Sequence, residues 1–402
     1  MELEKREKRG NLYFALILIL FLFYYTYRYI LQYNDASSSA FVYDYTPEWI
    51  KWPKYILYMI ILALMAWNER GIHLEKQYRP VKIPVLILIL QCGICGVLIR
   101  DQQILTFTLM LIPVLLYPGI GGTPREETVE KILNVFWIYT TVYEIIQVVL
   151  FYTTGRVPAL AFPHFGTITA IRYGGALDDP NGYAMILVFY VFYFLTQKGS
   201  VRSYVCLVIT LAMLVFTWSG TGYLVLLATA IVFLLLRIRD REVLKKYGIV
   251  ALAVLIIAIP VALIAGKQVW NFIVSFIGDK SYSTNLHMKS WDVSGIQLST
   301  WLGVHPARDT FREVGFLRLV EIGGVWALLL FLFASIAGII KGNKELSDRL
   351  EASRPLYYGS LAYLIGFLFS MLNLPHLTNF SVMGPFSVFL ILSISQAKKK
   401  ES

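Results

Sequence analysis

The sequence predicts an all-α, polytopic integral membrane protein of about twelve transmembrane helices. Three observations lead to this expectation. Of the 402 residues, 57% are hydrophobic and only 15% are charged, and the mean hydropathy is +0.61. A soluble domain carries about a quarter charged residues. Apolar runs of about 20 residues, long enough to cross a hydrocarbon core, recur along the chain. Lys and Arg gather in alternate loops between these runs.

The apolar runs define the expected spans, which form a single membrane domain over residues 1–402. They cover residues 12–32, 53–67, 83–99, 103–119, 132–153, 182–196, 203–217, 221–237, 247–266, 317–340, 355–372 and 380–396.

The orientation follows from the basic residues. One set of loops, with both termini, holds 24 Lys and Arg, and the opposite set holds 11. Because short basic loops stay in the cytoplasm, we expect both termini to be cytoplasmic. The net charge of +10 is spread between spans, so it indicates topology and contact with membrane lipids and not nucleic acid.

Two predicted outer loops are longer than tight turns, residues 154–181 and 267–316. Long loops in a compact protein are usually functional or disordered. The second carries aromatic residues that are too many for a disordered tether, among them Trp270, Phe272, Phe276, Trp291, Trp301 and Phe311. We therefore expect one large folded outer loop.

The first loop ends in Arg-x-x-Gly-x-x-x-Asp-Pro-Asn-x-x-Ala at 172–184, directly before a span. Asp179 suits an N-cap and Pro180 the first helical position. A tight turn at Gly174 and Gly175 would bring Arg172 over that helix end. Two interpretations remain open: a capped helix with a solvated arginine, or an anion site in which Arg172 and helix N–H groups hold a phosphate.

This pattern resembles the hallmark of the O-antigen polymerase and O-antigen ligase superfamily. Further motifs resemble other elements of that family in the same order. They are Trp-Ser-Gly-Thr-Gly-Tyr at 218–223, Trp-Leu-Gly-Val-His at 301–305, where a second glycine of the family motif is missing, and Glu-x-Gly-Phe-Leu-x-x-x-Glu-x-Gly-Gly at 313–324. The resemblance covers roughly residues 130–395.

The resemblance implies a GT-C-like membrane glycosyltransferase in the bacterial cytoplasmic (inner) membrane, with its active site at the outer face. Its donor and acceptor would be undecaprenyl-diphosphate-linked oligosaccharides, its partners a chain-length regulator and a flippase, and it would need no cofactor. Ligases of this family commonly carry a His-Asn pair where this chain has Glu313 and Val314, which favours a polymerase. We therefore expect Glu313 or His305 to act as base or acceptor orienter.

Basic residues of the large loop are candidates for holding the diphosphate together with Arg172. Arg308 and Arg312 are four residues apart, so on a helix they share a face. A guanidinium group can donate two parallel hydrogen bonds to two phosphate oxygens. Lys289 roughly matches a family arginine. The alternative for these residues is a solvated basic face near lipid headgroups. No outer carboxylate pair has a spacing that demands Mg²⁺, and Cys92 and Cys95 lack a second ligand pair, so we expect no metal.

Ionisable residues inside the spans are costly in hydrocarbon. Glu144 and Glu321 can face a cavity open to the outer surface, or Glu144 can form a helix-packing hydrogen bond. Arg28 is expected to snorkel to the interface.

Three alternatives to a polymerase stay open. An O-antigen ligase would transfer glycan to a lipid-core acceptor, and a transporter would flip lipid-linked glycans. Transporters tend to show repeated halves, which this chain lacks. A non-enzymatic membrane scaffold would not need arginines beside a rigid helix cap.

Overall fold

The computed structural model describes most of the predicted spans and part of the first outer loop. The described residues are 1–26, 33–35, 48–100, 102–119, 124–154, 156–158, 161–163, 171–177, 179–197, 200–236, 274, 291, 314–346, 349 and 354–396.

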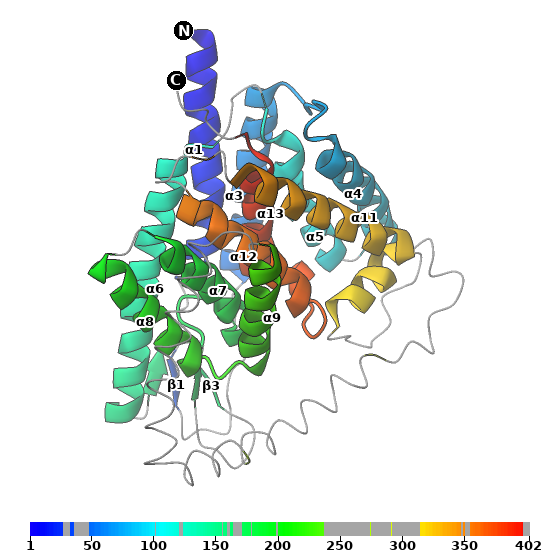
Figure 1. Ribbon diagram of the computed structural model, residues 1–402. Coiled ribbons are helices and arrows are strands. Elements are labelled where there is room, and N and C mark those ends of the chain that lie inside the picture. The colour runs from blue at the N-terminus through cyan, green and yellow to red at the C-terminus, as the bar shows by residue number, and fades with distance from the viewer. Residues whose placement is uncertain are drawn as a thin grey trace.

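Helices dominate this part of the chain, so the all-α expectation is confirmed (Figure 1). They are α1 (Glu2–Phe23), α3 (Glu48–Glu69), α4 (Arg79–Ile99), α5 (Gln102–Leu116), α6 (Glu126–Thr154), α7 (Pro180–Thr196), α8 (Val201–Phe216), α9 (Gly220–Leu236), α11 (Gly315–Glu345), α12 (Arg354–Ser370) and α13 (Phe380–Ile394). A 3₁₀ turn, His376–Thr378, precedes α13.

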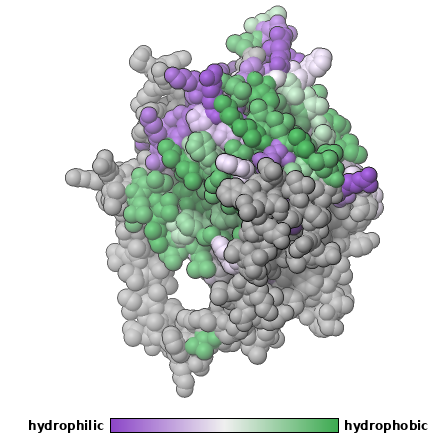
Figure 2. All heavy atoms as spheres, turned by 90° about the vertical axis from the view of Figure 1, so that its right-hand side faces the viewer, coloured by the Kyte–Doolittle hydropathy of each residue, from purple (hydrophilic) through white to green (hydrophobic). Residues whose placement is uncertain are grey.

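Among the described residues, three helical segments are long and apolar enough to cross a membrane, namely Arg79–Leu98, Glu126–Thr154 and Gly323–Glu345. Five shorter helices are also apolar. Figure 2 shows hydrophobic residues over the middle of one face and hydrophilic residues toward the end where α1 begins. These features indicate a helical membrane protein, while the number of twelve spans stays a prediction.

Each predicted span overlaps a described helix, except 247–266, which lies outside the described residues. Helix α1 begins at Glu2, ahead of the predicted span 12–32, and residues 27–32 of that span lie outside the described residues. Ion pairs between residues four apart, Glu2 with Arg6 and Glu4 with Lys8, join successive turns of its polar beginning. Hydropathy alone does not detect such a polar helical turn.

The core lies around α7, α12 and α13, whose residues are almost all buried. A helix that is apolar on every side belongs inside a bundle, and α7 packs against α8, α9 and α12. The first turn of α7 therefore lies among other helices, and residues of those helices can contact it.

Segments that are distant in the sequence meet at the end of the molecule where the chain begins. The contacts there are Asn68 to the Arg6 carbonyl (3.1 Å), Lys341 to the Gln77 carbonyl (3.1 Å), Arg349 to Glu126 (3.4 Å) and the Arg125 amide to Asn11 (2.7 Å). All belong to segments predicted to be cytoplasmic. The structure thus groups these segments at one end, while the side of the membrane that they face stays a prediction.

The opposite end carries two short antiparallel strand pairs (Figure 1). Strand β1 (Tyr33–Asp35) pairs with β2 (Arg156–Pro158), and β3 (Ala161–Pro163) pairs with β4 (Ile171–Tyr173). Strand β4 leads into the turn before α7, so it places Arg172 at this end.

Helix α11 is kinked where its sequence reads Gly323-Gly324. Gly324 has φ 79°, which favours glycine, and the Gln91 side chain donates a hydrogen bond to the Gly323 carbonyl. A Cβ on Gly323 would also meet the Cys92 sulfur at 2.6 Å. The two glycines therefore allow both the kink and the close packing of α11 on α4.

Candidate functional site

The N-terminus of α7 has the cap that the sequence predicts. Asp179 is extended, with φ −145° and ψ 132°, and its Oδ2 accepts a hydrogen bond of 2.9 Å from the Gly182 amide. Pro180 occupies the first helical position, where its missing N–H costs nothing. These two predictions are confirmed.

The turn before the cap depends on Gly175. The Leu177 amide donates to the Gly174 carbonyl (3.0 Å), and Gly175 has φ 53°, in the left-handed region. Its missing side chain leaves room for the Tyr183 ring, which lies where a Cβ would be. The turn is thus tied to α7, and it reverses the chain as expected.

The reversal brings Arg172 over the start of α7. Its guanidinium donates to Asn181 Oδ1 (2.8 Å) and to the Thr217 carbonyl at the end of α8 (3.3 Å). Arg172 is partly buried, and burial lowers the pKa of its guanidinium, while Asp179 and Tyr223 oppose that shift. An arginine nevertheless stays protonated in proteins. Arg172 is therefore a positioned cation and not a freely solvated one.

Asn181 connects this turn to the start of α9. Its Oδ1 also accepts a hydrogen bond of 2.7 Å from Ser219, whose Oγ accepts one of 2.9 Å from the Gly222 amide. Ser219 thus caps α9 while it binds Asn181. Sequence reasoning identified both motifs but missed their contact, for which the sequence carries no local signal.

The charges around Arg172 favour an anion. The N-termini of α7 and α9 both lie near the guanidinium, and helix N-termini carry partial positive charge. The end of α8 contributes the Thr217 carbonyl oxygen, which accepts a hydrogen bond from the guanidinium. Among the described residues no carboxylate forms an ion pair with Arg172. The Asp179 carboxylate accepts from Gly182 and Asn181, and it acts on the guanidinium through its charge. A phosphate here would meet a cation and helix N-termini together.

Helix α6 supports the same turn from inside the bundle. The Ala176 amide donates to the Thr140 hydroxyl (3.0 Å), and Glu144, one helical turn later, is 2% exposed and interacts with the Tyr183 hydroxyl. This burial argues against a cavity open to the outer surface at Glu144, while the helix-packing hydrogen bond stays a prediction. Glu321, the other candidate, pairs with Arg318 at 3.5 Å.

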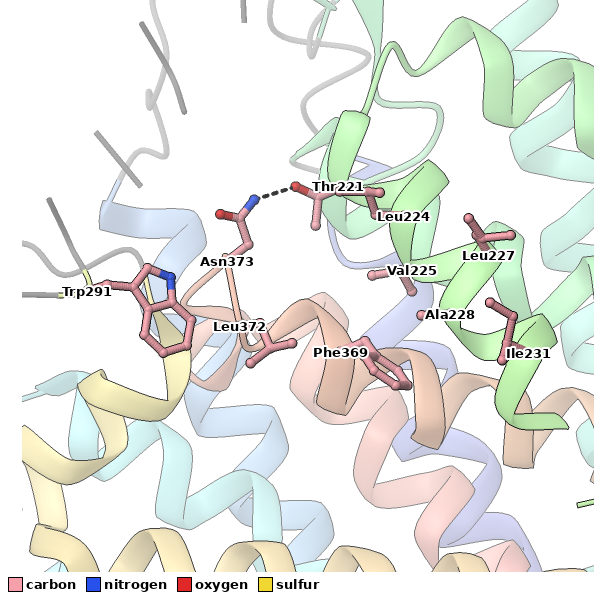
Figure 3. A pocket seen from close by; sticks show the side chains of 10 residues that line it. All are labelled: Thr221, Leu224, Val225, Leu227, Ala228, Ile231, Trp291, Phe369, Leu372 and Asn373. Carbon is pink, nitrogen blue, oxygen red and sulfur yellow. Dashed lines mark hydrogen bonds between the residues drawn. The ribbon is translucent and has the colours of Figure 1, made fainter. Parts of the chain in front are cut away.

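A groove of about 500 Å³ runs between α9 and α12 (Figure 3). At one end the Asn373 amide donates to the Thr221 hydroxyl (2.8 Å). Beyond this pair the wall is apolar, formed by Leu224, Val225, Leu227, Ala228, Ile231, Phe369 and Leu372, and Trp291 of the large loop lies beside it. Thr221 lies two residues after Ser219, so the polar end of the groove adjoins the Arg172 network.

The remaining site predictions fall on Glu313, His305, Lys289, Arg308 and Arg312, which lie outside the described residues, as does Arg28. Of the predicted diphosphate ligands, the structure thus describes Arg172 alone. Within the described part of the chain, no group of three or more His, Cys, Asp or Glu residues could hold a metal ion.

Comparison of the chain with models of known protein families found no match, and neither did comparison with curated proteins.

Proposed function

We propose that the protein is a membrane glycosyltransferase that polymerises lipid-linked glycans at the outer face of the bacterial cytoplasmic membrane. It would transfer an oligosaccharide from undecaprenyl diphosphate to another lipid-linked repeat unit. The observation that carries this proposal is the position of Arg172, a cation held at two helix N-termini.

The reaction needs a group that stabilises the departing diphosphate. An acceptor hydroxyl attacks the anomeric carbon of the donor sugar, and the bond from that carbon to the phosphate oxygen breaks. The diphosphate leaves with the electron pair, so negative charge develops on its oxygens. Donors positioned in advance, such as the Arg172 guanidinium and helix N–H groups, stabilise that charge without reorganising. Arg308, Arg312 and Lys289 are proposed to complete the diphosphate site.

The acceptor proton needs a base. Glu313 is the proposed group, with His305 as the alternative imidazole, because both lie in the part of the large loop that resembles the family. General-base catalysis contributes about 10²–10⁴-fold in rate. Since arginines can neutralise the diphosphate, we expect elongation to continue with a chelator present.

The groove between α9 and α12 suits the lipid chain of the substrate. Its wall is apolar, and its polar end lies two residues from Ser219 in the Arg172 network. A diphosphate bound at Arg172 would therefore have an apolar channel beside it for its isoprenoid chain.

The test is elongation by the purified full-length protein given only lipid-linked repeat units. A ladder of longer lipid-linked chains, formed with chelator present, is expected. Glu313→Gln should slow this ladder about 10²–10⁴-fold if the carboxylate takes the proton. His305→Ala is the control, since imidazole is the other base. A requirement for a lipid-core acceptor, with His305 essential, would show a ligase, and movement of intact units across vesicles without elongation would show a transporter.

A further inference from the structure

A second hollow lies at the opposite end of the molecule from Arg172, where α1 begins and α3 ends. It has a volume of about 530 Å³ and is lined by Glu2, Arg6, Arg9, Ala66, Trp67, Asn68 and Arg70. Helices α1 and α3 pack on one another, so the hollow is a fixed feature of this pair. The proposed glycan chemistry does not use any of these residues.

The lining carries more positive than negative charge. One carboxylate oxygen of Glu2 serves both Arg6 (3.6 Å) and Arg70 (3.3 Å). Arg9 has no ion pair with a carboxylate among the described residues, and its Nε donates to the Lys5 carbonyl at 3.4 Å. The lining thus holds three guanidinium groups and one carboxylate, which pairs with two of them. Arginine binds phosphate oxygens well because its donors form a planar fork.

Exposed apolar side chains continue from the hollow along both helices. On α1, Leu12 lies three residues after Arg9, and Leu16 lies four residues after Leu12. All three therefore share one face of the helix. On α3, Leu64 precedes Trp67 by three residues, and Trp67 is 83% exposed. Tryptophan prefers the interface between headgroups and hydrocarbon in membrane proteins. Basic groups therefore lie at the end of an exposed apolar surface.

We propose that this hollow binds the headgroup of an anionic phospholipid, with the acyl chains along the exposed faces of α1 and α3. The phosphate would contact Arg9 and Arg70, whose positive charge Glu2 only partly balances. A free inorganic phosphate could use the arginines but not the apolar faces, so a lipid fits both features. Basic pockets beside membrane helices bind anionic headgroups by the same charge complementarity.

The test compares lipids and variants on the purified full-length protein. Native mass spectrometry in detergent, during titration with phosphatidylglycerol or phosphatidylcholine, should show preferential retention of phosphatidylglycerol. Arg9→Gln and Arg70→Gln should each weaken that binding about fivefold, the contribution of one basic side chain near an anionic surface. Lys8→Gln is the matched control, since Lys8 neighbours Arg9, pairs with Glu4 at 2.9 Å and does not line the hollow.

Equal binding of the two lipids would overturn the proposal. So would equal weakening by Lys8→Gln and Arg9→Gln, or displacement of phosphatidylglycerol by the same concentration of inorganic phosphate. Size-exclusion profiles of the variants identify any that fail to fold, and retained binding by folded Arg9→Gln protein would also overturn it. None of these measurements depends on glycan elongation, so the proposed function and the lipid site can fail separately.

Discussion

The Arg172 guanidinium donates a hydrogen bond of 2.8 Å to Asn181 Oδ1, and the same oxygen accepts one of 2.7 Å from Ser219. One amide group therefore joins the turn before α7 to the start of α9. Since buried hydrogen-bond networks define geometry closely, this contact holds the cation in one position relative to two helix N-termini.

Replacement of Arg172 tests the anion site directly. Arg172→Ala should reduce polymer about 10²–10³-fold, the usual effect of removing one donor that stabilises developing charge. Arg172→Lys should restore little, because an ammonium cannot reach Asn181 and Thr217 with the fork of a guanidinium. Polymer is measured on surface glycan, with the membrane level of each variant determined alongside. A normal amount of polymer from the alanine variant would exclude an anion site at Arg172. Its hydrogen bonds to Asn181 and Thr217 would then have a structural role alone.

Asn181→Asp separates charge from shape at the same position. The aspartate keeps the oxygen that accepts from Arg172 and Ser219, but it places a carboxylate against the guanidinium. We expect folded protein with strongly reduced polymer, because the new anion competes with the diphosphate. Full activity of this variant would indicate that no anion binds at Arg172, and Asn181→Ala shows the effect of losing the hydrogen bonds alone.

Asp179→Ala tests the cap of α7. Loss of the hydrogen bond to the Gly182 amide should lower the free energy of unfolding by about 1 kcal/mol, whereas Asp179→Asn should lose less. Thermal unfolding in detergent measures the difference. Ser200→Ala is the matched control, since Ser200 caps α8 with a hydrogen bond of 3.1 Å from the Ser203 amide. A stability loss for Ser200→Ala alone would contradict the role of Asp179.

The groove between α9 and α12 can be filled by one substitution. Ala228→Trp places an indole against Leu224 and Phe369, so the KM for a lipid-linked donor should rise. Leu235→Trp is the control, because Leu235 is exposed on the same helix but does not line the groove. Equal kinetics for the two variants would show that the lipid chain lies elsewhere.

The orientation in the membrane is tested by labelling single cysteines in a chain without Cys92, Cys95 and Cys206. Thr153 and Lys76 are both exposed, Thr153 at the end of α6 beside β2 and Lys76 at the end where the chain begins. A membrane-impermeant reagent added outside should label Thr153→Cys and not Lys76→Cys. The reverse result would place the Arg172 network in the cytoplasm and exclude the proposed reaction there.

Much of the fold could be predicted because apolar length and capping chemistry are local. The run at 182–196 lies within α7, and residue type predicted the cap at Asp179, the place of Pro180 and a tight turn at Gly174 and Gly175. The polar turns of α1 before residue 12 were not assigned to any element, because hydropathy does not register the ion pairs that join them.

The candidate site was only partly predictable for the same reason. The contact between Asn181 and Ser219 spans 38 residues, and it exists because α9 packs closely on α7. Gly222 permits that approach, since a Cβ there would meet the Ala184 side chain at 2.5 Å. No spacing within either motif indicates this proximity.

Local chemistry alone therefore accounts for the apolar helices, the cap at Asp179 and the glycine turn that reverses the chain at Arg172. Helix packing decided the rest, namely the two hydrogen bonds to Asn181, the burial of Glu144 beneath the turn, and the groove beside Thr221. The physical reason is that a cap or turn is formed by neighbours in sequence. The surroundings of a charge depend instead on which helices are adjacent in space, and those helices come from distant parts of the chain.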